Sequence, residues 1–315
     1  MILRPTKDNI QKAATLLKKG DVIAFPTETV YGLGAVGLND QAIAKIYALK
    51  NRPKINPLIF HCLNIDWIKD IADVPPLAEK IADYFIPGPL TLVLQQKKDS
   101  KVSKLATAGL DTIAVRVPVH PIAQDLLSAV GTPLVAPSAN LSGRISSTQA
   151  SHVHSFFGDN IAAVLDGGDC CYGLESTILD LSTQTPTVLR QGAVPHETLE
   201  DVIGQPILTS SSLEKIKAPG QLKKHYAPSL PLRINVAIPK KGEAYIGFGE
   251  MECMFNLSPA GDLFEAAANL FKFLHQADDD QSFKGISIAP IPKKNIGIAI
   301  NDRLMRASYQ EETDE

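Results

Sequence analysis

The sequence predicts an α/β protein with one large domain, built on a mixed sheet, and a second, smaller α/β unit. Short apolar segments alternate with helical patterns over the first two thirds of the chain, too irregularly for a repeating strand–helix–strand array. The texture changes near residue 204, where proline and serine become frequent, and regular patterning resumes near residue 232. A chain of 315 residues is long enough to form two such units.

Eight short apolar runs of the first domain predict buried strands. They are VIAF (22–25), LIFHC (58–62), TLVLQ (91–95), TIAVRV (112–117), PLVAPS (133–138), AAVLD (162–166), STILDL (176–181) and TVLRQ (187–191). Helical periodicity appears in DNIQKAATLLKK (8–19), DQAIAKIYALK (40–50) and PIAQDLLSAV (121–130). The last begins with a proline, which suits a first helical position.

The chain divides into four predicted parts: a first domain (1–203), a linker (204–231), a small α/β domain (232–310) and a disordered acidic tail (311–315). The small domain carries the strand-like runs RINVAI (233–238), AYIGFG (244–249) and GISIAP (285–290) and the helical runs GDLFEAAANLFKFLHQ (261–276) and IAINDRLMRAS (298–308). The middle of the linker, APGQLKKHYAP (218–228), holds more functional side chains than a tether needs.

Composition excludes several classes of protein. The net charge of −3 argues against binding nucleic acid by bulk charge. The four cysteines (Cys62, Cys170, Cys171, Cys253) show no CxxC spacing, so we interpret them as reduced thiols rather than metal ligands. The N-terminal segment lacks the apolar core of a signal peptide, and no apolar run is long enough to span a membrane. We therefore expect a soluble, cytoplasmic protein without membrane contact.

The glycines Gly32, Gly34 and Gly37 match the spacing of a dinucleotide-binding fingerprint. That fingerprint requires the glycines to join a strand directly to a helix, with an acidic residue about twenty positions on. Here the strand is predicted to end near Pro26, the helix to start at the Asn39–Asp40 cap, and the chain near residue 54 is basic. We interpret the match as accidental. The P-loop, HExxH and GxSxG signatures are also missing from the sequence.

Polar and cationic side chains gather where the predicted strands end. Thr27, Glu28 and Thr29 follow the first strand, although a plain turn needs only one or two such residues. Lys50 and Arg52 lie between a helix and a strand. These cations could stabilise the C-terminal end of the helix through its dipole. Alternatively, because prolines stiffen the loop, they could bind a polyphosphate.

Two further segments each allow two interpretations when taken alone, and the second of them is the more specific signal. Arg116 lies inside an apolar strand, so its side chain either reaches the surface or pairs with a carboxylate in a pocket. The segment PLVAPSANLSGRISST (133–148) is either a solvated loop or a cradle for phosphate. Together, however, these residues place several cations and hydroxyls at one sheet edge without a nucleophile–histidine pair. That combination suggests adenylyl or phosphoryl transfer.

Six motifs in this order resemble the YrdC-type domain of threonylcarbamoyl-AMP synthases. They are PTETVYGLGA (26–35), K-x-RP-x-x-NPL (50–58), PGP-x-T (87–91), T-x-A-x-R-x-P (112–118), APSAN-x-SG (136–143) and ESTI-x-D (175–180). The segments APG-x-x-x-x-HYAP (218–228) and GIAINDRLMRAS (297–308) resemble the linker and C-terminal domain of the long form of that family. The resemblance covers essentially the whole chain, with small departures at Asn51 and Ser147.

The resemblance implies an open, twisted, YrdC-like mixed sheet and a Rossmann-like C-terminal domain. It also implies a nucleotidyltransferase that makes L-threonylcarbamoyl-AMP and pyrophosphate from L-threonine, bicarbonate and ATP with Mg²⁺. The product would pass to a separate transferase that modifies an adenosine in tRNA, with at most weak direct contact between this chain and tRNA. The alternatives are a carbamoyl-transfer domain and a non-catalytic RNA-binding module.

The family's site residues carry over position by position. The resemblance implies a threonine pocket made of Thr27, Thr29, His61, Arg116, Ala136 and Ser176. It implies an ATP site made of Lys50, Arg52, Asn56, Thr112, Ser138, Asn140, Ser146, Arg190 and Tyr226. Lys50 and Arg52 would be the catalytic cations, Tyr226 would close over the nucleotide, and Glu28 and Tyr31 would shape the loop. No protein ligand is assigned to the metal.

Overall fold

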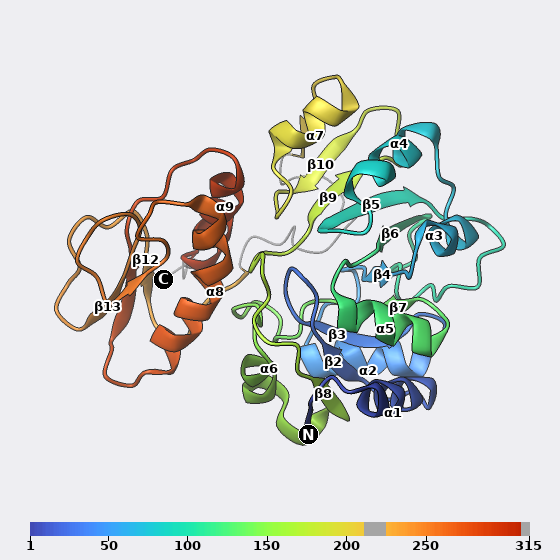
Figure 1. The fold of residues 1–315 in the computed structure, drawn as a ribbon, viewed down its shortest axis with the longest axis horizontal. Coiled ribbons are helices and arrows are strands. Elements are labelled where there is room, and N and C mark those ends of the chain that lie inside the picture. The colour runs from blue at the N-terminus through green and yellow to red at the C-terminus, as the bar shows by residue number, and fades with distance from the viewer. Residues whose placement is uncertain (211–224, 310–315) are drawn as a thin grey trace, which may run out of the picture.

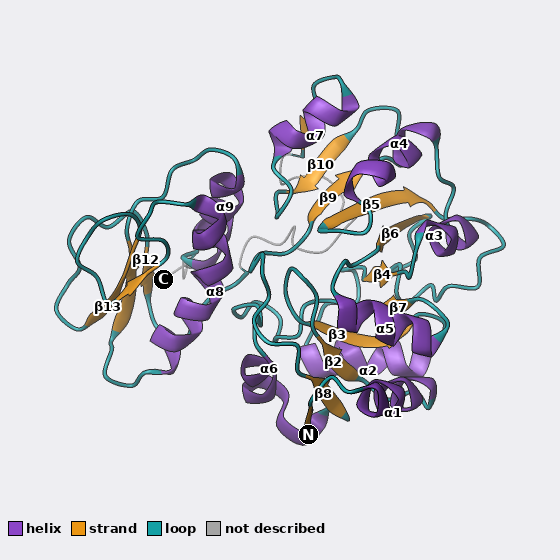
Figure 2. Cartoon of the chain, in the orientation of Figure 1, coloured by secondary structure: helices purple, strands orange, loops and turns teal. Residues whose placement is uncertain are grey.

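The computed structural model describes residues 1–210 and 225–309. Within them the first domain contains an eleven-stranded mixed sheet (Figures 1 and 2). Its strands, in spatial order, are β1 (Ile2–Leu3), β8 (Ala163–Leu165), β2 (Ile23–Phe25), β3 (Gly32–Val36), β7 (Leu134–Val135), β4 (Ile59–His61), β6 (Thr112–Arg116), β5 (Leu90–Gln95), β9 (Thr177–Asp180), β10 (Thr187–Arg190) and β11 (Leu208–Thr209). Its helices are α1 (Lys7–Lys18), α2 (Asp40–Lys50), α3 (Ile65–Ile71), α4 (Pro76–Phe85), α5 (Pro121–Val130), α6 (Ala150–Phe157) and α7 (His196–Ile203), with a 3₁₀ turn η1 (Gly158–Asn160).

Helices cover both faces of this sheet, because its strands alternate their side chains between two cores. Ile23 and Phe25 of β2 pack into a cluster with apolar residues of α1 and α5. Ala24, between them, belongs to the cluster on the opposite side, which includes Ile43 and Ile46 of α2. The period of two along the strand therefore explains why the first domain has two apolar layers rather than one.

Each of the eight predicted strands contains an observed strand, and three strands were missed. β1 and β11 are two-residue edge strands, too short to leave a pattern. β3 pairs antiparallel with β2 and contains Gly32 and Gly34 of the accidental fingerprint, while Gly37 follows its last residue. A Cβ atom at Gly34 would lie 2.7 Å from the ring of Phe25, so glycine is needed there for close packing. Helix α2 begins at the predicted Asn39 cap, whose side chain accepts a hydrogen bond from the Ala42 amide.

The C-terminal domain has a four-stranded parallel sheet, in the order β12 (Leu232–Arg233), β15 (Gly285–Ile288), β13 (Glu243–Gly247) and β14 (Phe255–Asn256). Its helices are α8 (Leu263–Asp279), which starts at an Asp262 cap, and α9 (Ile296–Ala307). Both helices lie between this sheet and the first domain (Figure 1). The domain is α/β, as predicted, and its finer Rossmann-like assignment stays a prediction.

The observed elements bear on the predicted boundaries as well. β11 joins the large sheet by pairing with β10, so the sheet reaches Thr209, beyond the predicted start of the linker at residue 204. Most of APGQLKKHYAP and the acidic tail lie outside the described residues, which resume at His225. Within the described ranges, no helix has both the length and the apolar character that a membrane span requires.

The two domains share an apolar core and several polar contacts. Val30, Ile145 and Leu174 of the first domain belong to the same buried cluster as Leu270 and Ile300 of α8 and α9. Around this cluster, Lys272 Nζ lies 2.8 Å from Asp169 Oδ2, Arg144 Nη2 lies 3.3 Å from Asp278 Oδ2, and His275 Nε2 donates to the carbonyl of Ser146 at 3.1 Å. The C-terminal domain is thus packed against the hydroxyl-rich loop that sequence analysis singled out.

Candidate active site

One pocket collects most of the residues predicted to form the site. The predicted residues that line it are Thr27, Thr29, Arg52, His61, Arg116, Ala136, Ser138, Ser176, Arg190 and Tyr226. The other lining residues are Val30, Tyr31, Gly32, Ile59, Pro137, Glu175 and His225. These side chains come from the ends of strands and from the loops that follow them, together with the start of the segment after the undescribed linker.

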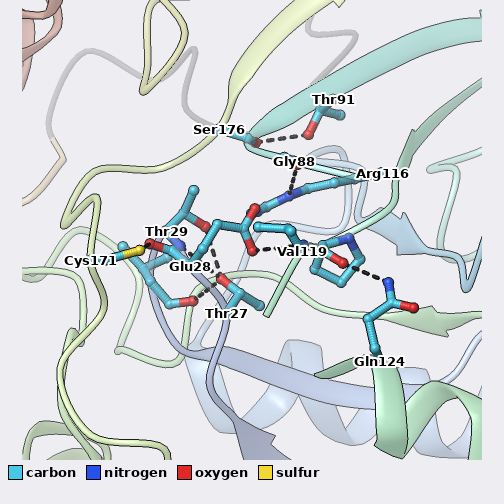
Figure 3. Close-up of polar contacts among 12 residues, drawn as sticks. Thr27, Glu28, Thr29, Gly88, Thr91, Arg116, Val119, Gln124, Cys171 and Ser176 are labelled. Carbon is cyan, nitrogen blue, oxygen red and sulfur yellow. Dashed lines mark hydrogen bonds and ion pairs between the residues drawn. The ribbon is translucent and has the colours of Figure 1, made fainter. Parts of the chain in front are cut away.

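A buried ion pair between Glu28 and Arg116 anchors one side of the pocket (Figure 3). Arg116 Nη2 donates to Glu28 Oε1, and Arg116 Nε donates to the carbonyl of Gly88 at 3.3 Å. The other carboxylate oxygen of Glu28 accepts from the amide of Val119 at 3.2 Å. The sequence left the direction of Arg116 open, and the structure turns it inward.

The geometry of this ion pair leaves one guanidinium nitrogen of Arg116 available to a ligand. Its Nη1 makes none of the hydrogen bonds found among the described residues. Beside it, the hydroxyl of Thr27 donates to the carbonyl of Val30 at 2.6 Å and lies 2.9 Å from the hydroxyl of Thr29. A guanidinium nitrogen next to ordered hydroxyls suits a small ligand that carries a carboxylate.

His61 lies next to Arg116 as a neutral side chain. Burial, followed by the charge of Arg116, lowers the pKa of His61 to about 3. Its Nδ1 lies 3.2 Å from the carbonyl of Ile59. Because a carbonyl only accepts, Nδ1 carries the proton and Nε2 remains a hydrogen-bond acceptor.

Arg190 and Ser176 form the middle of the pocket. Arg190 Nη2 donates to the carbonyl of Ser176 at 2.9 Å and to its hydroxyl at 3.1 Å. The same hydroxyl lies 2.7 Å from that of Thr91, which belongs to the predicted PGP-x-T motif. The end of β10 is therefore tied to the start of β9 by a cation that also faces the pocket.

A second buried ion pair, between Glu175 and Arg303, lies on the side where the domains meet. Arg303 Nε is 2.8 Å from Glu175 Oε2, and the hydroxyl of Ser146 donates to Glu175 Oε1 at 2.5 Å. Burial alone would raise the pKa of Glu175, but the charges of Arg303 and Arg190 and these hydrogen bonds lower it to about 2. The carboxylate is thus held ionised in a buried site.

The HYAP segment closes the pocket on the same side. The ring of Tyr226 stacks on Phe271 of α8 at 5.6 Å between centroids, and the guanidinium of Arg303 lies 5.1 Å from its centroid. The amide of Ala227 donates to the carbonyl of Gly143 at 2.8 Å, which joins this segment to the hydroxyl-rich loop. Burial lowers the pKa of the adjacent His225 to about 3.

The two cations predicted to be catalytic occupy different places. Arg52 lines the pocket and donates from Nη2 to the carbonyl of Pro57 at 2.9 Å. Lys50 lies behind the pocket wall, where Nζ donates to the carbonyl of Ser138 at 2.6 Å and to that of Asn140. Burial, followed by the charge of Arg52, lowers the pKa of Lys50 well below its ordinary value. Lys50 therefore holds the loop that presents Ser138 rather than lining the pocket itself.

Four other predicted residues also lie outside the pocket lining. Ser146 acts on the pocket through Glu175, as described above. The Asn140 side chain donates to the carbonyls of Leu141 and Arg144 at 2.8 and 2.9 Å and so shapes its own loop. Asn56 is buried beside Arg52, and Thr112 is the half-buried first residue of β6.

Sequence reasoning missed two residues of the site and gave no role to a third. Glu175 was present in the ESTI motif, but nothing distinguished it from a surface acid. Arg303 lies 128 residues away along the chain, so no local pattern connects the two. His225 was visible in the HYAP motif and lines the pocket beside Tyr226.

The carboxylates of the pocket do not make a metal site by themselves. Glu28 and Glu175 are each paired with an arginine. Across the described parts of the chain, no three histidine, cysteine, aspartate or glutamate side chains come together as metal ligands would. The carboxylates of Glu28 and Glu175 are therefore engaged with arginines rather than arranged as metal ligands.

Comparison with known proteins agrees with this geometry. The sequence model of the Sua5/YciO/YrdC family, described as "Telomere recombination", matches residues 15–192. A second model, described as "Threonylcarbamoyl-AMP synthase, C-terminal domain", matches residues 194–308.

Relatives resemble the chain over nearly its full length. The threonylcarbamoyl-AMP synthase of Pyrococcus abyssi is 39% identical over 321 residues, covering 95% of this chain and 94% of that one. The Bacillus subtilis protein of the same name is 38% identical over 323 residues, covering 95% and 92%. The crystal structure of P. abyssi Sua5 complexed with L-threonine superposes with a TM-score of 0.90 at 36% identity, covering 98% of this chain and 97% of that one. The chain therefore belongs to the threonylcarbamoyl-AMP synthase family, in the form that carries a C-terminal domain.

Proposed function

We propose that this protein is a nucleotidyltransferase that makes L-threonylcarbamoyl-AMP, pyrophosphate and water from L-threonine, bicarbonate and ATP. One observation carries the proposal: a single pocket joins a partly unpaired Arg116, beside ordered threonine hydroxyls, to Arg52, Arg190 and the Tyr226 ring. An amino acid and a nucleotide need these two kinds of surface next to each other. The names of the two relatives and the threonine bound to P. abyssi Sua5 support the same reaction.

The side of the pocket around Glu28 and Arg116 would bind threonine. Arg116 Nη1 pairs with the threonine carboxylate, while Glu28 fixes the guanidinium by holding Nη2. Thr27, Thr29, Ala136 and Ser176 surround the rest of the amino acid. His61 Nε2, as an acceptor, suits a hydrogen bond from the threonine amine or hydroxyl.

The other side would bind ATP with its Mg²⁺. Arg52 and Arg190 neutralise the phosphates, Ser138 offers a hydroxyl, and Tyr226 covers the nucleotide. Lys50, Asn140 and Ser146 hold the loops that present these groups. The carbonyl of Asn56 accepts a hydrogen bond from Arg52, and the ATP contact proposed for Thr112 would come from the start of β6. A Mg²⁺ ion bound to the phosphates, for which no protein ligand is assigned, would supply further positive charge against the charge that develops as pyrophosphate leaves.

The reaction then needs little covalent chemistry from the protein. The threonine amine combines with bicarbonate to give a carbamate and water, and a carbamate oxygen attacks the α-phosphorus of ATP while pyrophosphate departs. Both reactants are anions, so positioning and charge neutralisation supply the catalysis. The product is a labile mixed anhydride, which a buried pocket shields from water.

The product would serve a separate enzyme that transfers the threonylcarbamoyl group to an adenosine of tRNA. A net charge of −3 gives this chain little bulk attraction for tRNA, so we expect direct contact with it to be weak. A cytoplasmic location, expected from the reduced thiols, remains a prediction.

The test is to incubate the purified protein with ATP, threonine, bicarbonate and Mg²⁺, omitting each in turn, and to measure pyrophosphate and the adenylate by mass spectrometry. We expect the adenylate only when all four are present. Carbamoyl phosphate in place of threonine and bicarbonate should give none. Pyrophosphate release that ignores threonine, or a response to carbamoyl phosphate, would contradict the proposal. RNA binding without any adenylate would favour the binding module.

A further inference from the structure

Arg303 belongs to the C-terminal domain, yet its side chain is buried (1% exposed) against the candidate active site. Its three guanidinium nitrogens have three different partners. Nε lies 2.8 Å from Glu175 Oε2, Nη1 lies 2.7 Å from Asp302 Oδ2, and Nη2 donates to the carbonyl of Gln191 at 2.8 Å. The face of the guanidinium lies 5.1 Å from the centroid of the Tyr226 ring. A planar fork with this many directed contacts fixes its partners more firmly than a lysine would.

The partners of Arg303 either line the pocket or adjoin residues that do. Glu175 and Tyr226 are themselves lining residues, and Gln191 follows the pocket cation Arg190. Glu175 also holds the hydroxyl of Ser146. Arg303 therefore contacts Glu175 and Tyr226 of the pocket lining directly, and it reaches Arg190 through the neighbouring residue Gln191.

The two segments that Arg303 bridges cross each other closely. The amide of Ala193 donates to the carbonyl of Glu175 at 3.1 Å. A Cβ atom at Gly192 would lie 2.4 Å from that carbonyl oxygen, so only glycine fits at the crossing. These backbone contacts hold the two segments together, and Arg303 adds a side-chain contact to each of them, through Glu175 and through the carbonyl of Gln191.

Arg303 is not needed merely to hold the two domains together, because other contacts already do so. Lys272 and Asp169 join the same two domains through an ion pair whose side chains are 31% and 54% exposed. The shared apolar cluster adds further contact. Burying a guanidinium costs free energy that an exposed pair avoids, unless hydrogen bonds satisfy it fully.

We propose that Arg303 is a positioning residue for the nucleotide side of the pocket, through its hold on Glu175, Gln191 and the Tyr226 ring. The C-terminal domain thereby completes the nucleotide site, while the threonine side is built by the first domain. This inference rests on the proposed function, and it assigns a role in that function to the C-terminal domain.

The test compares Arg303→Met and Arg303→Lys in the full-length protein. Methionine keeps an unbranched apolar chain and removes the charge. We expect Arg303→Met to lower kcat/KM for ATP about 100-fold, through both constants. The Kd for threonine, measured by calorimetry, should stay within about twofold of the wild-type value, because Arg303 touches no residue of the threonine side. Arg303→Lys should have a kcat/KM for ATP about tenfold higher than that of Arg303→Met, since lysine restores the charge but not the planar guanidinium.

The pH profile separates positioning from a general structural role. Without Arg303, the pKa of Glu175 should rise, because burial then acts against fewer neighbouring charges. The Arg303→Met protein should therefore lose activity on acidification in a pH range where the wild type does not. The double variant Arg303→Met, Glu175→Gln should not show this additional loss of activity at acidic pH, because glutamine does not titrate.

Lys272→Met is the matched control, because it removes an ion pair of the same interface without touching the pocket. It should leave kcat/KM for ATP unchanged. If Arg303→Met fails to fold, Glu175→Gln in an otherwise wild-type chain should reproduce the nucleotide defect.

Three results would overturn the inference. The first is normal ATP kinetics in the Arg303 or Glu175 variants. The others are a loss of threonine affinity in Arg303→Met as large as its loss in kcat/KM for ATP, or the same loss in kcat/KM for ATP in Lys272→Met. A wild-type protein that makes no adenylate would instead contradict the proposed function. In that event, calorimetric binding of a non-hydrolysable ATP analogue to the wild type and to Arg303→Met still decides the role of Arg303.

Discussion

Two buried arginine–glutamate pairs border the same pocket, and they differ in where their members come from. Glu28 and Arg116 both belong to the first domain, where Glu28 lies in the loop between β2 and β3 and Arg116 is the last residue of β6. Glu175 belongs to the first domain, but its partner Arg303 comes from the last helix of the second. The first pair can therefore form as soon as one domain has folded, whereas the second exists only when both domains are docked. We expect only the nucleotide side of the pocket to depend on domain position.

The comparison also explains how each pair must be tested. Removing one member of a buried ion pair leaves an uncompensated charge, which typically costs about 3–5 kcal/mol of stability. A single substitution therefore mixes loss of binding with loss of folding. Variants that neutralise both members keep the two effects apart.

The largest expected effect is on threonine binding, through Arg116. Arg116→Met should abolish measurable threonine binding and also destabilise the fold, because Glu28 is left unpaired. Adding Glu28→Gln should recover most of the stability, measured by urea unfolding, but not the threonine affinity. We expect that affinity to remain lower by about 1.5–3 kcal/mol, the usual worth of hydrogen bonds to a charged group. Normal threonine affinity in the double variant, by calorimetry, would end this assignment.

A smaller effect should follow from changing Arg52, which lines the nucleotide side. Arg52→Ala should lower kcat by about 100-fold, because its charge matters most as pyrophosphate leaves. Threonine affinity should change little. The exposed Lys54 of the same loop offers a control, and Lys54→Ala should keep both constants. Steady-state kinetics in which Arg52→Ala retains a normal kcat would remove Arg52 from the phosphate site.

The third effect is on stability in acid, and it concerns the domain interface on which only the second pair depends. His152 of α6 stacks on His275 of α8, with centroids 3.9 Å apart. Burial, and then the other histidine, lowers the pKa of His152 to about 3, and burial also lowers the pKa of His275. Asp169, Lys272, Asp278, Asp279 and Arg144 are the charged groups around this stack.

The sign of the pH effect follows from these pKa values. Below the ordinary histidine pKa of about 6.5, the unfolded chain binds protons that the folded chain excludes. The free energy of unfolding should therefore fall as the pH drops from about 6.5 towards 3, by up to about 1.4 kcal/mol per pH unit for each such histidine. His152→Asn should flatten this slope by one histidine's share, while His154→Asn, exposed on the same helix, should not. Urea unfolding at several pH values measures both, and equal slopes in all three proteins would contradict the expectation.

Much of the first domain was predictable because its strands are apolar, short and bounded by turn residues. The same holds for the Asn39 cap and for helix α5, which begins at Pro121, as the sequence predicts. β3 escaped prediction because its glycines resemble a loop, and they are explained only by the Phe25 ring packed against them. Packing between residues of different strands, such as that of Phe25 on Gly34, leaves no recognisable pattern in the sequence.

The candidate site also divides into residues that local sequence patterns predict and contacts that only the structure reveals. Thr27, Thr29 and Arg116 could be found because each stands at or near the end of a recognisable strand. Lys50 was predicted to be a catalytic cation of the ATP site, yet only the structure reveals that it holds a loop behind the pocket wall. The pairing of Glu175 with Arg303 joins two domains across 128 positions of sequence. No single-sequence pattern reports a contact of that range.

The shared apolar cluster has a consequence for synthesis of the protein. Val30, Ile145 and Leu174 are made early, but the α9 residues of the same buried cluster, such as Ile300, are made near the end of the chain. At translation speeds of about 5–20 residues per second, the first domain waits on the order of ten seconds for that helix. During this interval a nascent first domain exposes apolar side chains beside its pocket. We therefore expect ribosome-bound chains that stop before α9 to recruit chaperones or aggregate more readily than the completed protein.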